Sequence, residues 1–371
     1  MRDGVRCAVG TRNIHFTTKL TKDTKVGEEQ DCKISLSDLR VLRGAIPIIA
    51  LALVFHFPAA TSALAQNIRI GIPGLSAEFT PVWAAKDRGR LKKHGLEAEI
   101  IVMQGGTQLV QALVGGSLDF AVMGGAYLSG AVRGADLVMV ATHMDRFPYS
   151  LIVKPSIKRS EDLKGTKLAI SRFGSSSDAG LRVALQRSGI NPDKDVTIMQ
   201  VGGQTERYAA LKAGVIDGTV VIPPLSSAAQ RAGFNSIINM AKLGIPFPQE
   251  GVVASRQYIA TRRDTLLRFL RAYLEAVRDL KAEKEFAIAV MARHLRMDPK
   301  KDREALEDSF QEVVIEQMLK VPYPSTEAVK MGIELLGKDR PAKASGDAKD
   351  YIDGSLMQEL EKSGFIQTLY K

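Results

Sequence analysis

Short apolar runs alternate with longer amphipathic stretches along most of the chain after residue 66. Ile68–Ile72, Ile100–Val102 and Phe120–Val122 have the length and composition of buried parallel strands, and the stretches between them have helical spacing. From about Thr261 the apolar positions recur at the spacing of a helix, as in Leu266, Leu267, Leu270, Tyr273, Leu274 and Val277. The pattern therefore predicts an α/β fold followed by a helical C-terminal tail.

The chain contains an internal repeat. Residues 112–122 (ALVGGSLDFAV) and 210–220 (ALKAGVIDGTV) share five of 11 positions at a separation of 98 residues. Each copy predicts a helix that ends at a glycine, a turn at Asp119 or Asp217, and a buried strand. We expect these aspartates to be structural. Two copies predict two similar α/β lobes, and a single long sheet is the alternative.

Strand and breaker positions set the predicted limits of the lobes. Leu151–Lys154 is predicted to be a strand that leaves the first lobe. The proline-rich segment Ile245–Pro248 breaks the pattern, and Gly251–Ser255 is predicted to be a strand that returns. Lobe I is therefore expected to comprise residues 66–155 and 251–371, and lobe II residues 156–250. The tail is expected to pack on lobe I.

An apolar run near the start indicates export. Arg40 and Arg43 precede 13 residues without formal charge, Ala45–Phe57, and small residues follow up to Ala65. This order is typical of a secretory signal peptide, which predicts a leader over residues 1–65 with cleavage after Ala65. A membrane anchor is the alternative, but a spanning helix needs about 20 apolar residues.

Composition narrows the chemistry of the exported part. Both cysteines, Cys7 and Cys32, lie in the leader, which excludes disulfides and thiol nucleophiles from the remainder. The remainder has 42 Lys and Arg and 35 Asp and Glu, a net charge of +7. A net charge of this size indicates at most a mild preference for anionic ligands. No basic run carries interleaved aromatic residues, so nucleic-acid binding is not predicted.

Candidate binding residues follow the carboxyl ends of the predicted strands, where ligands bind in parallel α/β lobes. Glycine and hydroxyl residues dominate these loops and favour a small anion held by backbone N–H groups and helix N-termini. Ser175–Ser177 before the predicted helix 178–186 are the best such group, with plain helix capping as the alternative. The predicted ligand-binding residues are Ser76, Phe79, Thr80, Gly106, Thr107, Gly124, Arg146, Ser175, Ser176, Gln204 and Pro223.

Catalytic and metal-binding motifs are absent from the sequence. His94, His143 and His294 are scattered without zinc-site spacing, and neither a nucleophile elbow nor a phosphate-binding loop is present. We therefore expect no catalytic residues, no metal and no cofactor, and a binding protein is favoured over an enzyme.

The same residues resemble the substrate-binding proteins of nitrate-, taurine- and sulfonate-type ABC importers, a group that includes thiamine-pyrimidine-precursor proteins. The resemblance runs from about residue 68 to 260. It is carried by residues 81–96 (PVWAAKDRGRLKKHGL), Gly105–Gly106, residues 112–119, residues 162–169 (DLKGTKLA) and residues 210–217.

The resemblance implies a type II periplasmic binding protein fold, with two lobes joined by two crossings near residues 154–157 and 247–251. It also implies a monomer in the periplasm that closes on a small organic or sulfonate-type anion. The protein would deliver this ligand to a membrane permease with a cytoplasmic ATPase. A thiamine-pyrimidine synthase-like enzyme and a periplasmic ligand sensor remain the alternatives.

Overall fold

The computed structural model describes residues 65–336 and 346–371, which belong to one compact unit. The predicted leader except Ala65, its apolar run and both cysteines lie outside the described residues. Within the described residues, no helix combines the length and apolar character needed to cross a membrane.

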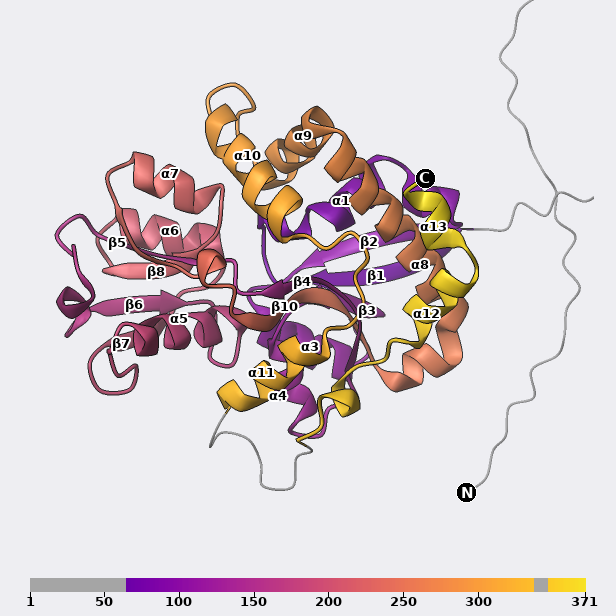
Figure 1. Ribbon diagram of the computed structural model, residues 1–371, viewed down its shortest axis with the longest axis horizontal. Coiled ribbons are helices and arrows are strands. Elements are labelled where there is room, and N and C mark those ends of the chain that lie inside the picture. The colour runs from indigo at the N-terminus through magenta and orange to yellow at the C-terminus, as the bar shows by residue number, and fades with distance from the viewer. Residues whose placement is uncertain (1–64, 337–345) are drawn as a thin grey trace, which may run out of the picture. The chain divides into compact units, whose positions relative to one another are not determined.

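Two five-stranded sheets form the framework (Figure 1). The first has the order β2-β1-β3-β10-β4 and the second the order β7-β6-β8-β5-β9. The strands of the first sheet are β1 (Gln66–Ile72), β2 (Leu96–Val102), β3 (Phe120–Met123), β4 (Val138–Arg146) and β10 (Pro246–Ala254). Those of the second are β5 (Ser150–Val153), β6 (Lys167–Ile170), β7 (Thr197–Gln200), β8 (Gly218–Val221) and β9 (Asn235–Asn239).

The two sheets are built alike. In the first, β1 pairs in parallel with β2 and β3, and β10 runs antiparallel between β3 and β4. In the second, β6 pairs in parallel with β7 and β8, and β5 runs antiparallel between β8 and β9. The predicted α/β fold with two similar lobes is thereby confirmed, and the alternative of one long sheet is wrong.

The aspartates of the sequence repeat, Asp119 and Asp217, make equivalent hydrogen bonds in the two sheets. The Asp119 carboxylate accepts from the backbone N–H of Arg69 at 2.6 Å, and the Asp217 carboxylate accepts from that of Lys167 at 2.7 Å. Each aspartate thus bonds to the backbone of the first parallel strand of its own sheet, within β1 at Arg69 and at the first residue of β6, Lys167. The expectation that these residues are structural is confirmed.

The crossings between the sheets differ from those predicted. They lie at residues 147–149, between β4 and β5, and at residues 240–245, between β9 and β10. The predicted positions near 154–157 and 247–251 are wrong because β5 already pairs within the second sheet and β10 begins at Pro246. Strand membership therefore places Ser150–Val153 with the second lobe and Pro246–Gln249 with the first.

Helices follow the strands of both sheets. The helices that follow strands of the first sheet are α1 (Thr80–Asp87), α2 (Arg90–Lys93), α3 (Gly106–Val114) and α4 (Ala126–Ala131), with the 3-10 turn η2 (Ala77–Phe79) before α1. Those of the second are α5 (Ser176–Arg187), α6 (Gln204–Lys212) and α7 (Leu225–Arg231), with the 3-10 turns η3 (Ser160–Leu163) and η4 (Ala241–Leu243).

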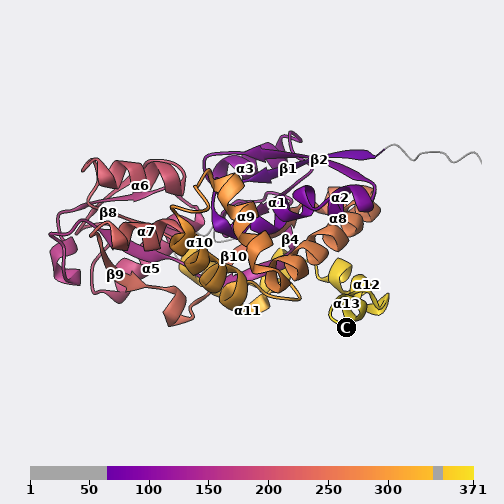
Figure 2. The same cartoon turned by 90° about the horizontal axis from the view of Figure 1, so that it is seen from above.

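The C-terminal tail is helical, as predicted. It comprises α8 (Arg256–Ala282), α9 (Lys284–Leu295), α10 (Arg303–Ser309), the π-helix η5 (Phe310–Gln317), α11 (Thr326–Leu336), η7 (Ala348–Tyr351), α12 (Ser355–Lys362) and α13 (Phe365–Leu369). Helix α8 packs on α1, α2 and β2, and α11 packs on β10, so the tail covers the first sheet. Figure 2 shows α10 reaching α7 of the second lobe, where Arg231 pairs with Asp308 at 2.9 Å.

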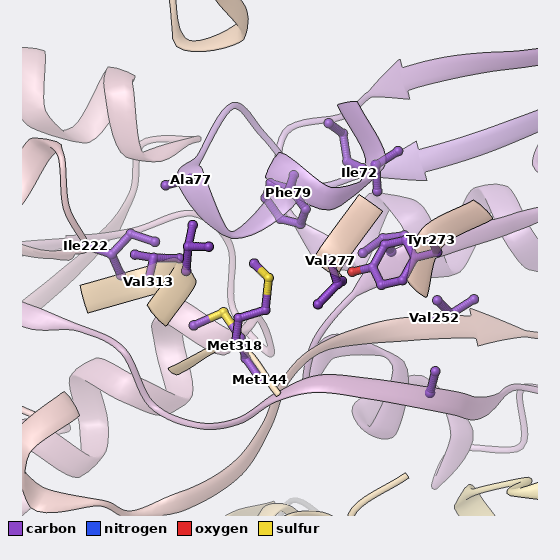
Figure 3. Packing of buried hydrophobic residues seen from close by; sticks show 14 of the residues in the cluster. Ile72, Ala77, Phe79, Met144, Ile222, Val252, Tyr273, Val277, Val313 and Met318 are labelled. Carbon is purple, nitrogen blue, oxygen red and sulfur yellow. The ribbon is translucent and has the colours of Figure 1, made fainter. Parts of the chain in front are cut away.

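The main hydrophobic cluster lies between the first sheet and the tail helices and continues into the second lobe. Tyr273 and Leu270 of α8 are fully buried there against Phe120 and Phe269. Phe79 of η2 is 1% exposed, and its ring points into the same cluster (Figure 3). This packing fixes η2 at the carboxyl end of β1, where the candidate site begins.

Candidate functional site

A small cavity lies between the loops of the two sheets. Its volume is about 50 Å³, enough for a ligand of a few heavy atoms or several waters. Loops that follow strands of both sheets contribute to its wall, as predicted for parallel α/β lobes.

The cavity brings together seven of the predicted binding residues and leaves four outside its wall. Those that line it are Ser76, Phe79, Gly106, Gly124, Ser175, Ser176 and Gln204. Thr80 instead donates its hydroxyl to the Ala77 carbonyl at 2.5 Å, and Thr107 donates to the Phe173 carbonyl at 3.2 Å. Arg146 is exposed and pairs with the adjacent Asp145, and Pro223 is buried in the turn after β8.

The predicted anion site at the start of α5 is already occupied by internal hydrogen bonds. The hydroxyls of Ser171, Ser175 and Ser177 form a triangle with separations of 2.9 to 3.0 Å. The Ser175 hydroxyl also accepts from the Asp178 N–H, which caps the helix. Ser176 accepts from the Gly125 N–H at 3.0 Å. Helix capping is therefore seen at Ser175, whereas Ser176 contacts the first lobe.

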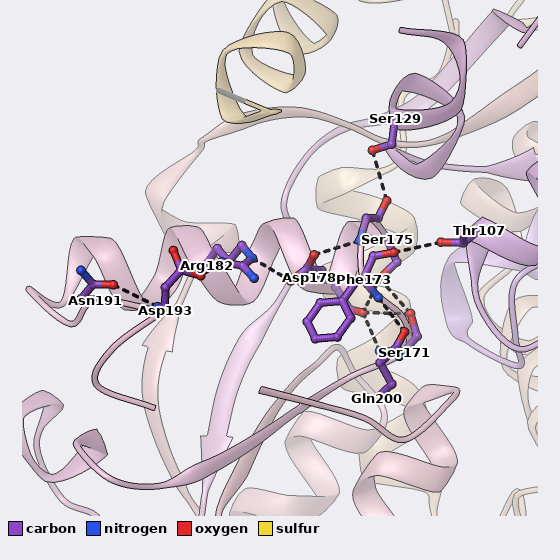
Figure 4. Close-up of polar contacts among 12 residues, drawn as sticks. Thr107, Ser129, Ser171, Phe173, Ser175, Asp178, Arg182, Asn191, Asp193 and Gln200 are labelled. Carbon is purple, nitrogen blue, oxygen red and sulfur yellow. Dashed lines mark hydrogen bonds and ion pairs between the residues drawn. The ribbon is translucent and has the colours of Figure 1, made fainter. Parts of the chain in front are cut away.

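Several polar contacts join the two lobes around the cavity. Gln204 of α6 donates to the Ser76 hydroxyl at 2.8 Å, and Ser129 of α4 donates to the Gly174 carbonyl at 3.3 Å. Figure 4 shows Thr107 and Ser129 of the first lobe facing the loop that contains Phe173. Because these bonds need both lobes in contact, they stabilise a closed cleft.

Sequence reasoning missed the charged residues of the cavity. Glu78 of η2, Glu250 of β10 and Arg207 of α6 all line it, and each is 4% exposed or less. Burial raises the pKa of Glu78 from 4.5 to about 7 and raises the pKa of Glu250 well above 4.5, with repulsion from Glu78 adding to the second shift.

Arg207 is held by the second sheet. Its guanidinium donates to the Thr219 hydroxyl at 2.9 Å, to the Gly202 carbonyl at 2.6 Å and to the Val220 carbonyl at 3.0 Å. Burial lowers its pKa to about 10, so it stays protonated at neutral pH. It is the cationic side chain in the described cavity wall.

Gln249 and Tyr149 connect the charged groups. The Gln249 side chain donates to the Glu78 carboxylate at 3.4 Å and to the Tyr149 hydroxyl at 3.0 Å. Two buried acceptors, Oε1 of Gln249 and Oε1 of Glu250, have no hydrogen-bond partner. Such atoms are rare in folded proteins, and here both belong to residues of the cavity wall.

His143 fixes the backbone beneath Glu78. Its Nε2 lies 3.1 Å from the Glu78 carbonyl, and its Nδ1 lies 2.7 Å from the Tyr273 hydroxyl. Burial lowers its pKa to about 4, so the ring is neutral, with Nε2–H donating and Nδ1 accepting. The described residues hold no group of three or more His, Cys, Asp or Glu side chains that could bind a metal.

Comparison with known proteins shows the family to which the chain belongs. The sequence pattern of the family described as NMT1/THI5 like matches residues 76–287, more than half of the chain. The chain belongs to this family. The match includes most of the residues that line the cavity and all strands of the second sheet.

Individual relatives agree with this assignment. A Brucella abortus (strain 2308) protein described as a binding protein is 29% identical over 243 residues, 64% of this chain and 74% of the relative. The alkanesulfonate-binding protein SsuA from Xanthomonas axonopodis pv. citri, solved with MOPS, aligns with a TM-score of 0.62 at 20% identity. The alignment covers 79% of this chain and 97% of that one.

A third comparison names the fold. A Candida albicans protein described as exhibiting the generic periplasmic binding protein fold aligns with a TM-score of 0.61 at 15% identity, over 78% of this chain and 96% of that one. NMT1/THI5-like chains and these structures thus share the two-lobed architecture found here, and the predicted fold and family are confirmed.

Proposed function

We propose that this protein is the periplasmic solute-binding component of an ABC importer. It captures a small organic molecule in the cavity between its lobes and delivers it to a membrane permease with a cytoplasmic ATPase. The observation that carries the proposal is the cavity whose walls come from both lobes and are joined by hydrogen bonds such as Gln204 to Ser76.

Closure is the mechanism that this geometry supports. The chain passes between the sheets at 147–149 and 240–245, and these two short connections form the hinge. A ligand that touches both walls binds the closed form more tightly than the open one and so shifts the population towards closure. The permease can then recognise the closed shape.

A binding role is favoured over catalysis. The exported chain has no cysteine, so it has no counterpart of the cysteine-rich motif of thiamine-pyrimidine synthases. The cavity wall is dominated by glycine and by hydroxyls that bond to one another. A sensor would use the same binding step, and permease and ATPase genes beside this one would favour the importer.

The experiment is a thermal-shift and cargo-release measurement on the purified protein. The protein is unfolded and refolded to strip its cargo, which is identified by mass spectrometry, and then tested with alkanesulfonates, taurine, nitrate, aromatic carboxylates, pyrimidines and amines. A ligand at 100 times its Kd should stabilise the fold by about 2.7 kcal/mol. Small-angle scattering should show compaction with the same ligand. Absence of any cargo, any stabilisation and any compaction would contradict a solute-binding role.

A further inference from the structure

Two buried carboxyl groups face the cavity from the first lobe. Glu78 and Glu250 are 4% and 2% exposed, and both belong to its wall. Oε1 of Glu250 and Oε1 of the adjacent Gln249 have no hydrogen-bond partner. Leaving a buried acceptor unsatisfied is costly, so a ligand that donates hydrogen bonds to these two atoms would gain binding energy.

Part of the hydrogen-bond donor capacity of the cavity wall is already used within the protein. Three of the five N–H groups of the Arg207 guanidinium donate to acceptors of the second lobe. The hydroxyls of Ser171, Ser175 and Ser177 bond to one another. With both carboxylates ionised and Arg207 protonated, the charged side chains of the wall sum to −1.

We propose that the cargo carries a compact cationic N–H donor, an ammonium or amidinium group, that binds between Glu78 and Glu250. This inference rests on the proposed solute-binding function and replaces the predicted anionic ligand with a cationic one. A cation would satisfy both unpartnered oxygens and balance the second carboxylate.

The titration of the pair supports a cation. Because burial raises the pKa of Glu78 to about 7 and that of Glu250 well above 4.5, the empty pair retains a proton near neutral pH. A cation favours the ionised form of both groups and so releases that proton on binding.

The groups packed around the pair do not supply this proton. Arg207 stays charged, and burial raises the pKa of the Tyr149 and Tyr273 hydroxyls far above the physiological range. His143 is neutral because burial lowers its pKa to about 4. Affinity for a cation should therefore rise as the pH increases from 6 to 8.

The test uses three probes of the same shape and different charge: acetamidinium, acetamide and acetate. Isothermal titration calorimetry compares them, together with methanesulfonate and nitrate, on the refolded protein. The variants are Glu78→Gln and Glu250→Gln, which keep size and remove charge. Glu312→Gln is the matched control, because burial also raises the pKa of Glu312 to about 7 but the residue lies outside the cavity wall.

We expect acetamidinium to bind at least tenfold more tightly than acetamide, and acetate not to bind. Each cavity variant should weaken acetamidinium at least tenfold, and Glu312→Gln should leave it unchanged. Titrations in two buffers of different ionisation enthalpy should show proton release. Circular dichroism and the unfolding midpoint confirm that each variant is folded.

Other outcomes separate this inference from the proposed function. Binding of acetate, methanesulfonate or nitrate in preference to acetamidinium would overturn the cationic cargo and leave the solute-binding role intact. If no probe binds, the released cargo decides: a cationic cargo supports the inference, and an anionic or neutral one overturns it. Absence of both probe binding and cargo would overturn both proposals.

Discussion

Glu78 should make the stability of this protein fall as the pH rises. Its pKa increases from 4.5 in an exposed setting to about 7 in the folded protein because the carboxyl is buried. The folded state therefore prefers the protonated form. This preference contributes fully below pH 4.5 and is lost as the pH rises through 7. A shift of this size corresponds to about 3 kcal/mol, at about 1.4 kcal/mol per pH unit.

The variant Glu78→Gln isolates this contribution. Glutamine keeps the size and hydrogen bonding of the protonated acid but cannot ionise. The free energy of unfolding of the wild type relative to the variant should thus fall by about 3 kcal/mol between pH 4.5 and pH 8. His143 has the opposite pH dependence, because its pKa is lowered to about 4, but it is present in both proteins and cancels in the comparison.

Urea titrations at half-unit pH intervals would measure the difference. Trp83 is the single tryptophan of the chain, is 2% exposed and stacks on His294 at 4.9 Å, so its fluorescence reports unfolding of the main core. The slope of free energy against denaturant should be the same for the two proteins. Parallel curves of stability against pH would refute the reasoning, because they would mean that Glu78 titrates at an ordinary pKa when folded.

Three further substitutions test the cavity and its closure. Gly124→Ala should lower both stability and ligand affinity, because a Cβ would lie 1.8 Å from the Gln249 carbonyl oxygen; thermal shift and calorimetry measure the two losses. Thr107→Val removes the hydroxyl that donates to the Phe173 carbonyl, which should destabilise the closed form relative to the open form by about 0.5–1 kcal/mol. Small-angle scattering without ligand should then show a larger average radius of gyration than for the wild type. Arg207→Met leaves several buried acceptors without donors and should cost about 2–4 kcal/mol in urea unfolding; an unchanged midpoint would show that water replaces the guanidinium.

The framework was predictable because it depends on local pattern. The apolar runs and the repeat around Asp119 and Asp217 are visible in the printed sequence, and each aspartate makes the same backbone contact in its own sheet. The antiparallel strands were less visible. Strand β10 begins at Pro246, within a proline-rich segment that resembles a chain break, and its pairing with β3 and β4 makes it a strand.

The polar residues of the site were harder to predict, because their role depends on how the lobes meet. Ser175 and Ser176 have the pattern of an anion site, yet their hydroxyls bond within the protein. Glu78 and Arg207 have the sequence context of surface residues, and only tertiary packing buries them. A signal was present at Glu250, which directly precedes the predicted buried strand 251–255 and so stands at the amino-terminal end of an apolar run.

The matching sheets have a consequence for how the binding surface could diverge. Two copies of one scaffold face each other, but their side chains at the cavity are unlike: the acids Glu78 and Glu250 come from one copy and the base Arg207 from the other. The strand-anchoring aspartates lie at the far ends of the strands, away from that wall. Each half can therefore exchange its recognition residues without disturbing the shared frame, so a duplicated architecture supports an asymmetric receptor.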